Sequence, residues 1–182
     1  KTHLSHIFPS FNIPIIAVKK PNGTYHLVQD LRHINSAVVP LHPVVANPYT
    51  LLSTIPSGTS HFSVLDLKDA FFSIPLDAQS QNIFAFTWTD PDTHFSTQLT
   101  WTVLPQGFWD SPHLFGQALA SDLLFLSLCK SKIILCVDDI LLCSPSLKIS
   151  QADTTALLNF LSSQGYRVSP SKVQLPTPQV TY

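Results

Sequence analysis

The sequence predicts an α+β fold in which helices pack on one face of an antiparallel sheet. Several pairs of short apolar runs are separated by turn residues, a pattern that is typical of β-hairpins. Two longer segments have apolar residues at helical spacing and alternate with these hairpins. The composition suits a packed domain, because 45% of the 182 residues are hydrophobic and only 12% are charged. This balance excludes a disordered chain.

The N-terminal part predicts one hairpin after a loose lead-in over residues 1–12. Apolar runs at 13–19 and 25–31 read as two strands, and Pro, Asn and Gly at 21–23 form the turn between them. The turn places Lys20 near the hairpin tip. The hairpin therefore displays a cationic side chain at its end.

The middle of the chain predicts a loop-rich stretch followed by three strands. Residues 36–60 are rich in Pro and Ser, and only 47–53 has the composition of a short helical turn. A strand follows at 62–67, and a second hairpin pairs 83–89 with 97–103 around an Asp-Pro-Asp turn.

The C-terminal part predicts two helices that flank another hairpin. The first helix begins at Ser111, an N-cap residue, with Pro112 in the first helical position. The second covers about 150–163 and ends at Gly165. Short strands at 166–168 and 172–175 follow, and the whole pattern is typical of helices layered on a sheet.

Two adjacent carboxylates lie at the centre of the apolar run 133–142. Asp138 and Asp139 would be costly to bury without a partner, so the run predicts a tight hairpin with both at its tip. Carboxylates on a rigid hairpin suit hard divalent cations such as Mg²⁺. The alternative is a turn that uses Asp only for its backbone geometry.

A third carboxylate, Asp66, stands at the end of the strand predicted at 62–67. Beside Asp138 and Asp139 it would complete a site for two divalent ions about 4 Å apart. Without metal, three clustered carboxylates would repel one another and raise each other's pKa. On its own, Asp66 could equally be a capping or surface residue.

Composition also limits the classes of function. The formal net charge is −1, with 10 Lys and Arg against 11 Asp and Glu, which is a weak electrostatic footprint for a protein that binds a polyanion. Three cysteines lie in apolar stretches at a spacing that matches no zinc pattern, so a reduced, intracellular setting is expected. No secretory signal or membrane-spanning run is present. Methionine is absent, and we expect the chain to be a segment of a longer reading frame.

Three motifs, in this order, resemble those of retroviral reverse transcriptases, most closely the gammaretrovirus-like type. They are Val64-Leu65-Asp66-Leu67-Lys68-Asp69-Ala70-Phe71-Phe72, Leu104-Pro105-Gln106-Gly107-Phe108 with Ser111-Pro112, and Val137-Asp138-Asp139. Supporting stretches are Val28-Gln29-Asp30-Leu31-Arg32, Phe84-Ala85-Phe86 and Gln98-Leu99-Thr100-Trp101-Thr102. The resemblance covers about residues 10–182.

The resemblance implies the fingers and palm of a right-hand polymerase. Fingers would comprise mainly 10–60 and 76–104, and palm mainly 61–75 and 105–182, with thumb, connection and RNase H absent. The implied activity is RNA-directed DNA synthesis, in which dNTPs extend a primer on an RNA or DNA template. Two Mg²⁺ ions are the implied cofactors, with Mn²⁺ as a substitute. The implied partners are the nucleic acid, dNTPs and the rest of the Pol polyprotein, in the cytoplasm or a virus-like particle; the oligomeric state is left open.

The family's functional residues carry over by position. Asp66, Asp138 and Asp139 match the metal-binding aspartates. Phe71 matches the bulky residue that excludes a ribose 2′-OH, and Gln106 matches a residue that contacts the incoming nucleotide.

Four further residues match by position. Lys20 matches a lysine that reaches the triphosphate, with a solvated turn residue as its alternative. Lys172 matches a proposed proton donor to pyrophosphate. Asp30 and Arg32 match a structural ion pair, and Phe72 is expected to pack in the core.

The chain departs from the family pattern at four positions. Cys136 replaces a tyrosine, and His26 replaces an arginine, which would grip phosphate and is always charged. Trp109 and Asp110 stand where a basic residue and an asparagine are expected, so we predict a repelling charge there. These changes leave open a second hypothesis, a catalytically inert endogenous retroviral remnant that binds nucleic acid or protein weakly.

Overall fold

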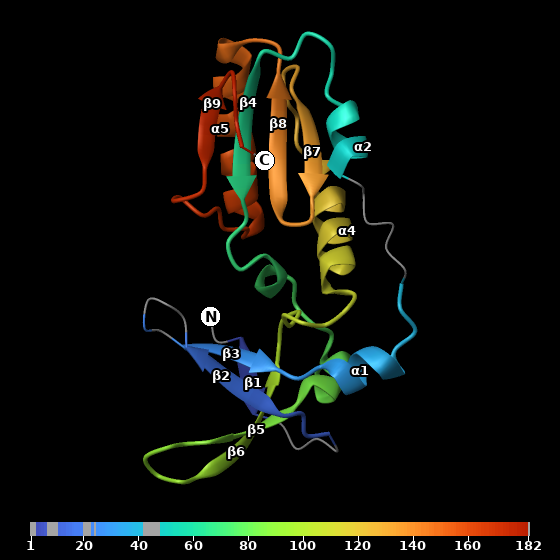
Figure 1. The fold of residues 1–182 in the computed structure, drawn as a ribbon, viewed down its shortest axis with the longest axis vertical. Coiled ribbons are helices and arrows are strands. Elements are labelled where there is room, and N and C mark those ends of the chain that lie inside the picture. Colours follow the sequence, from blue (N-terminus) through green and yellow to red (C-terminus); the bar gives the residue numbers. More distant parts are fainter. Residues whose placement is uncertain (1–2, 7–10, 20–22, 24, 42–47, 182) are drawn as a thin grey trace. The chain divides into compact units, whose positions relative to one another are not determined.

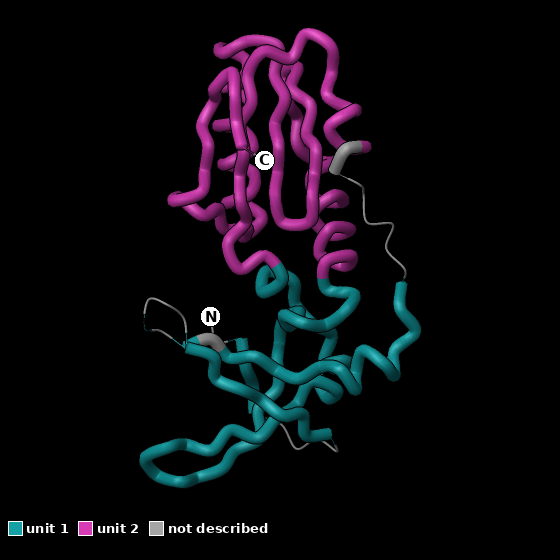
Figure 2. Tube along the Cα trace, viewed as in Figure 1, with its two compact units in different colours: residues 1–41, 71–111 teal, residues 42–70, 112–182 magenta. Residues whose placement is uncertain are grey.

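The protein forms two compact units, each with its own antiparallel β-structure (Figure 2). A computed structural model describes residues 3–6, 11–19, 23, 25–41 and 48–181. Unit 1 comprises residues 1–41 and 71–111, and unit 2 comprises 42–70 and 112–182. All strand pairs in the described part of the chain are antiparallel, and the α+β prediction is confirmed.

Unit 2 is built on a four-stranded sheet in the order β7-β8-β4-β9 (Figure 1). The strands are β4 (His61–Asp66), β7 (Lys132–Cys136), β8 (Asp139–Ser144) and β9 (Gln174–Thr177). The central strands are the apolar runs expected from the sequence, and Leu65, Ile140 and Leu142 are fully buried. The predicted strand at 166–168 is reduced to one bridge between Leu67 and Val168.

Both faces of this sheet are covered. Helix α5 (Leu147–Gln164) lies on one face, where the Ser63 and Thr154 hydroxyls hydrogen-bond at 2.8 Å (Figure 1). On the opposite face, Leu51 of α2 (Pro48–Ser53) and Ile55 pack against a cluster formed by Val64, Ile134, Leu141 and Cys143. Apolar residues occupy consecutive positions of β4 and β8, so both faces need cover, rather than the single face that the sequence suggested.

The two long helices follow their predicted positions. Helix α4 (Ser111–Leu123) buries Phe115 and Leu119 completely. Helix α5 begins three residues earlier than expected, because Ser146 is its N-cap and accepts a hydrogen bond from the Ile149 amide at 3.4 Å. It ends as predicted at Gly165, whose φ of +88° is a left-handed conformation that glycine adopts without strain.

Unit 1 contains a three-stranded sheet and a separate hairpin. The sheet has the order β1-β6-β5, from β1 (Leu4–His6), β6 (Ser96–Trp101) and β5 (Phe86–Thr89), and the hairpin joins β2 (Ile15–Lys19) to β3 (Tyr25–Gln29). The prediction of a loose lead-in over residues 1–12 was wrong for residues 4–6, which form a strand that pairs with β6. Three residues are too few to leave a periodic signal.

Short helical elements in and beside unit 1 replace parts of the predicted loops and strands. They are α1 (Arg32–Ala37), η1 (Ala70–Ser73), α3 (Ala78–Gln81) and η2 (Asn82–Phe84). The strand expected from residue 83 begins instead at Phe86, since η2 occupies the three residues 82–84. Asp77 caps α3 and accepts a hydrogen bond from the Gln79 amide at 3.0 Å.

The core of unit 1 contains a buried polar bridge. The Gln29 amide donates to the Phe84 carbonyl at 2.8 Å and accepts from the Trp101 indole N–H at 3.0 Å. Phe72 stacks on Trp101 with a ring-centroid distance of 5.2 Å, so its predicted role in core packing is confirmed. Burying these polar groups costs little, because each has a partner.

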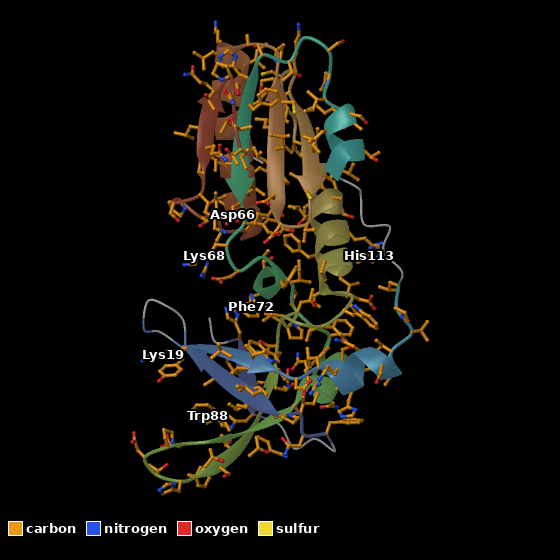
Figure 3. The ribbon with its side chains drawn as sticks, in the orientation of Figure 1. Lys19, Asp66, Lys68, Phe72, Trp88 and His113 are labelled. Atoms are coloured by element: carbon orange, nitrogen blue, oxygen red, sulfur yellow. The ribbon has the colours of Figure 1, made fainter. Side chains whose placement is uncertain are left out.

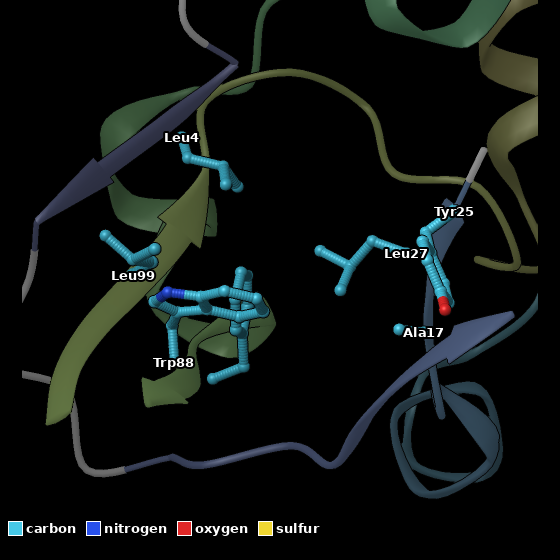
Figure 4. Close-up of a pocket in the computed structure, with 7 residues that line it drawn as sticks. Leu4, Ala17, Tyr25, Leu27, Trp88 and Leu99 are labelled. Atoms are coloured by element: carbon cyan, nitrogen blue, oxygen red, sulfur yellow. The ribbon is translucent and has the colours of Figure 1, made fainter. Parts of the chain in front are cut away.

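Unit 1 also has an apolar pocket of about 400 Å³ that is open to solvent (Figure 4). Its lining comes from both β-sheets of the unit and comprises Leu4, Ala17, Tyr25, Leu27, Phe86, Trp88 and Leu99. No ionisable acid or amine lines it among the described residues. In the described part of the chain, no helix is long and apolar enough to span a membrane.

Candidate active site

Two predicted site aspartates are paired directly across strands of unit 2. In the β4–β8 register, Asp66, the last residue of β4, lies opposite Asp139, the first residue of β8 (Asp66 is labelled in Figure 3). Directly opposed residues of an antiparallel pair point to the same face, with Cβ atoms about 4.5–5.5 Å apart. Alternation places both on the face of Val64 and Leu141, opposite α5. The sheet thus presents two carboxylates side by side.

The third aspartate lies in the two-residue turn between β7 and β8. Cys136 pairs with Asp139, so Val137 and Asp138 form the loop. The Asp138 carbonyl accepts a hydrogen bond from the Leu67 amide at 3.1 Å, which ties the turn to the residue after Asp66. The predicted hairpin with its acidic tip is therefore present.

The turn carries backbone strain. Val137 has a φ of +56°, although a β-branched residue rarely adopts the left-handed region. Such a conformation costs on the order of 1–3 kcal/mol and persists only where the surroundings enforce it. Here β7 and β8 enforce it through their register. The strain is stored next to Asp138 and Asp139.

Lys172 brings a positive charge to the same site. Its ammonium donates to Asp66 Oδ2 at 2.7 Å, and the Asp66 side chain is 17% exposed. The segment that carries Lys172 is fastened to the end of β4, since the Ser169 amide donates to the Asp66 carbonyl at 2.9 Å and the Lys172 amide donates to the Ser169 carbonyl at 3.0 Å. The ion pair is therefore held by the backbone on both sides.

The charges of this cluster influence one another. Burial raises the pKa of the Asp139 carboxyl, and the negative charges of Asp138 and Asp66 raise it further, while Lys172 acts in the opposite sense. The hydrogen bond to Asp66 raises the pKa of the Lys172 ammonium, with smaller contributions from Asp139 and Asp138. All four groups thus act electrostatically as one cluster.

The chemistry of this cluster fits a divalent cation. Hard cations prefer carboxylate oxygens, and a positive ion would relieve the crowding of negative charge that raises the pKa of Asp139. Within the described ranges, however, no three His, Cys, Asp or Glu side chains are arranged to hold a metal ion. Asp66 is instead engaged by Lys172.

Gln106 lies in unit 1, on a loop that two side chains fasten through three hydrogen bonds. The Asn35 amide donates to the Gly107 carbonyl at 3.0 Å, and its oxygen accepts from the Trp109 amide at 3.0 Å. The Ser111 hydroxyl donates to the Pro105 carbonyl at 2.8 Å. Gly107 has a φ of +89°, which turns the chain sharply after Gln106. Gln106 itself is exposed at the outside of this bend.

The start of α4 closes this loop. The helix begins at Ser111, whose buried hydroxyl donates to the Pro105 carbonyl. Asp110, which we expected to present a repelling charge, is 4% exposed and accepts a hydrogen bond from the Leu41 amide at 3.2 Å. The carboxylate serves the local fold. Trp109 is 63% exposed.

The other predicted residues lie elsewhere. Phe71 is half-buried in η1 and belongs to unit 1. Lys20 and the side chain of His26 lie outside what the structure describes. The predicted Asp30–Arg32 pair is confirmed, with both guanidinium contacts at 2.6–2.8 Å, and it lowers the pKa of Asp30 to about 2. Within the described residues of unit 2, the structure brings together the three aspartates and Lys172.

Sequence reasoning missed Asn35, which lies 72 residues from Gly107 along the chain. An asparagine inside a helix is unfavourable unless its side chain has another partner, and that was the only available signal.

Comparison with known proteins decides the family. The sequence model described as "Reverse transcriptase (RNA-dependent DNA polymerase)" matches residues 18–182. The chain belongs to the reverse transcriptase family. Over 176 residues this reverse transcriptase chain is 50% identical to the Gag-Pol polyprotein of baboon endogenous virus (strain M7), covering 94% of the chain and 10% of the polyprotein.

Other relatives agree. The Pol polyprotein of feline endogenous virus ECE1 is 48% identical, with 94% of this chain and 17% of the relative covered, and the Gag-Pol polyprotein of koala retrovirus is 47% identical, with 94% and 10% covered. The retroviral resemblance predicted from the motifs is confirmed. The reverse transcriptase chain spans about a tenth to a sixth of these polyproteins.

Solved structures show the same fold. A foamy viral protease-reverse transcriptase in complex with double-stranded DNA matches 99% of this reverse transcriptase chain and 30% of its own, with a TM-score of 0.82 and 29% identity. A second, in complex with an RNA/DNA hybrid, matches 94% and 22%, with a TM-score of 0.77 and 30% identity. The polymerase fold expected from the sequence is therefore present.

Proposed function

We propose that this chain supplies the fingers and palm of an RNA-directed DNA polymerase that joins a dNTP to a primer 3′-OH. One observation carries the proposal: in a chain of the reverse transcriptase family, Asp66 and Asp139 are directly opposed at a sheet edge, with Asp138 in the adjoining turn. Opposed like charges destabilise a sheet, so a function that uses them explains their presence.

The two units overlap with the two proposed regions but do not share their bounds. Unit 2 holds the acidic cluster and most of the proposed palm, and unit 1 holds most of the proposed fingers. Residues 48–60, expected in the fingers, belong to unit 2, and residues 71–75 and 105–111, expected in the palm, belong to unit 1. Gln106, on its fastened loop, is the proposed contact to the incoming nucleotide. Phe71 is the proposed steric block against a ribose 2′-OH, and Lys20 is the proposed contact to the triphosphate.

Asp66, Asp138 and Asp139 would hold two Mg²⁺ ions, or Mn²⁺ in their place. Such ions, when bound, lower the pKa of the attacking hydroxyl and neutralise charge on the leaving group. In the transfer itself, the primer 3′-hydroxyl gives its proton to water and its oxygen forms a bond to the α-phosphorus, while the bond between the α-phosphorus and the bridging β-phosphate oxygen breaks and pyrophosphate leaves. Lys172 is the proposed donor of a proton to pyrophosphate, a role that requires its ammonium to leave Asp66.

The proposed nucleic-acid partner follows from the same likeness. The foamy viral structures were solved with double-stranded DNA and with an RNA/DNA hybrid. We propose a template–primer duplex of either kind for this chain, with dNTPs as co-substrates. We also propose that the rest of a Pol polyprotein, including a thumb, completes the duplex-binding surface.

A second candidate function is an inert retroviral remnant that only binds. The observation that favours it is the net charge of −1, because polyanion affinity rests on Lys and Arg neutralising phosphates. Cys136 adds to this, since it replaces an aromatic residue next to the acidic turn. Both hypotheses share the fold and differ in catalysis.

Primer extension on poly(rA)–oligo(dT) with Mg²⁺ separates the two, using the longest polypeptide that carries this chain. The enzyme hypothesis expects extension that Asp138→Asn abolishes while duplex affinity is kept, with Asp92→Asn, a change to an exposed turn aspartate, as the matched control. Extension that survives Asp138→Asn would refute the assigned site. Duplex binding without extension in the unchanged protein would favour the remnant.

A further inference from the structure

Lys172 pairs with Asp66, a proposed metal ligand, from a segment that backbone hydrogen bonds fasten to the end of β4. The Lys172 ammonium is 2.7 Å from Asp66 Oδ2. The chain around it is fastened to β4 by the Ser169–Asp66 hydrogen bond and by a further one from the Lys68 amide to the Arg167 carbonyl at 2.8 Å. This anchoring sets the lysine backbone within reach of the carboxylate.

We propose that Lys172 is the resident counter-cation of Asp66 and competes with a divalent ion for that carboxylate. Metal binding and release of the Lys172 ammonium are then coupled. The proposal rests on the proposed function only in taking Asp66 as a metal ligand. It adds a second role for Lys172 that is distinct from proton donation.

Charge and exposure support this competition. Asp139, directly opposite Asp66, is repelled by it, and Lys172 offsets part of that repulsion. A divalent ion at Asp66 would meet an ammonium that already uses one of the two carboxylate oxygens. The Lys172 side chain is 65% exposed, so it can swing into solvent when the ion arrives. The same movement frees the ammonium for a phosphate.

The arrangement of the other ligands is consistent with this state. Where the structure describes the chain, no three metal-binding side chains are gathered, and the Asp66 carboxylate is paired with Lys172. Releasing Asp66 from the lysine would leave it facing Asp139 alone. We therefore expect the lysine to stabilise the metal-free chain and to weaken metal binding.

The test compares Mn²⁺ affinity, measured by electron paramagnetic resonance, among variants of the 182-residue chain. Lys172→Gln removes the competing charge, and Lys172→Arg keeps it. Lys148→Gln is the matched control, because Lys148 is an exposed lysine of the same unit that follows the opposite end of β8. Lys68→Gln, another exposed lysine two residues after Asp66, controls for the general field of a nearby charge.

Lys172→Gln is expected to bind Mn²⁺ about five-fold more tightly, the upper range for the loss of one partly exposed ion pair. Lys172→Arg and Lys148→Gln should match the unchanged chain, and Lys68→Gln should have a smaller effect than Lys172→Gln. In EDTA, Lys172→Gln should melt about 2–4 °C lower, and saturating Mn²⁺ should abolish the difference.

Equal or weaker Mn²⁺ binding by Lys172→Gln would overturn the proposal, as would an equal effect of Lys68→Gln. Asp66→Asn separates this failure from failure of the proposed function. If the unchanged chain binds Mn²⁺ and Asp66→Asn abolishes it, the metal site stands whatever Lys172 does. If no variant binds Mn²⁺, both proposals fail.

Discussion

Asp153 is a structural carboxylate whose removal should weaken unit 2 strongly. It is 1% exposed in α5 and accepts hydrogen bonds from the amides of Cys129, Lys130 and Ser131 at 2.7, 3.3 and 3.0 Å. Each hydrogen bond to a charged group contributes about 1.5–3 kcal/mol. Cys129 and Lys130 are exposed, so their amides regain water when the carboxylate is lost.

We therefore expect Asp153→Ala to lower the free energy of unfolding by about 2–4 kcal/mol, less than the sum of three bonds. Asp153→Asn should cost about 1–2 kcal/mol. The asparagine oxygen can still accept from the loop, but its NH₂ group would face the N–H of a loop amide, and two donors cannot hydrogen-bond to each other. Urea unfolding followed by circular dichroism at pH 7 measures both. Asp92→Asn is the control and should leave the midpoint unchanged.

The same residue predicts a pH dependence. Burial alone would raise the pKa of Asp153, but hydrogen bonds from the Ser131 side chain and from the loop amides outweigh it, so the pKa is lowered. The stability that the carboxylate contributes is then complete above its unfolded pKa of about 3.9 and is lost as pH falls through the lower folded value. The gap between the unchanged chain and Asp153→Asn should shrink from pH 7 to pH 2.5. A constant gap, or no gap at pH 7, would refute this.

Three further predictions follow from local geometry. Val137→Gly should raise the free energy of unfolding, measured in urea, by about 1 kcal/mol, because glycine removes the strain of a positive φ at this half-exposed position. A loss of stability would contradict this reasoning. Tyr166→Phe should lower the free energy of unfolding by about 1–2 kcal/mol in the same assay, since the buried phenol donates to Asp122 Oδ2 at 2.6 Å. An unchanged free energy would show that this hydrogen bond adds nothing to stability. Asn35→Ala should increase amide hydrogen exchange at Trp109 at least several-fold, and unchanged protection would mean that Asn35 does not hold the loop.

Local chemistry made the acidic hairpin and the helix ends predictable from the sequence. Apolar runs on both sides of Asp138 leave a two-residue turn as the only way to keep the carboxylates at the surface, and Gly165 ends α5 because the left-handed conformation suits it. These features depend on neighbouring residues, and the sequence displays them directly.

Features that depend on distant residues could not be predicted in this way. Asn35 acts on a loop 72 residues away, and Asp110 caps an amide 69 residues away, so neither role leaves a local pattern. The burial of Asp110 could not be predicted for this reason, because a sequence shows a charge and not its surroundings. The pairing of Lys172 with Asp66 is likewise set by the β4 anchoring of residues 167–172.

The acidic cluster should cost the metal-free chain stability, in contrast to Asp153. Burial and the charges of Asp138 and Asp66 raise the pKa of Asp139, so its ionisation disfavours the folded state. The penalty is absent at low pH and appears as pH rises through the unfolded and then the folded pKa, which is the opposite linkage to that of Asp153.

Asp139→Asn should therefore stabilise the chain in EDTA at pH 7 by about 0.5–1 kcal/mol, because it removes a charge directly opposite Asp66. Urea unfolding at pH 7 and pH 4 measures the effect, which should be smaller at the lower pH. A chain that is destabilised at pH 7 would show that the carboxylate holds the hairpin together. If Asp139→Asn is more stable than the unchanged chain, then Asp139 lowers the stability of the metal-free fold, as expected for a residue whose role is chemical.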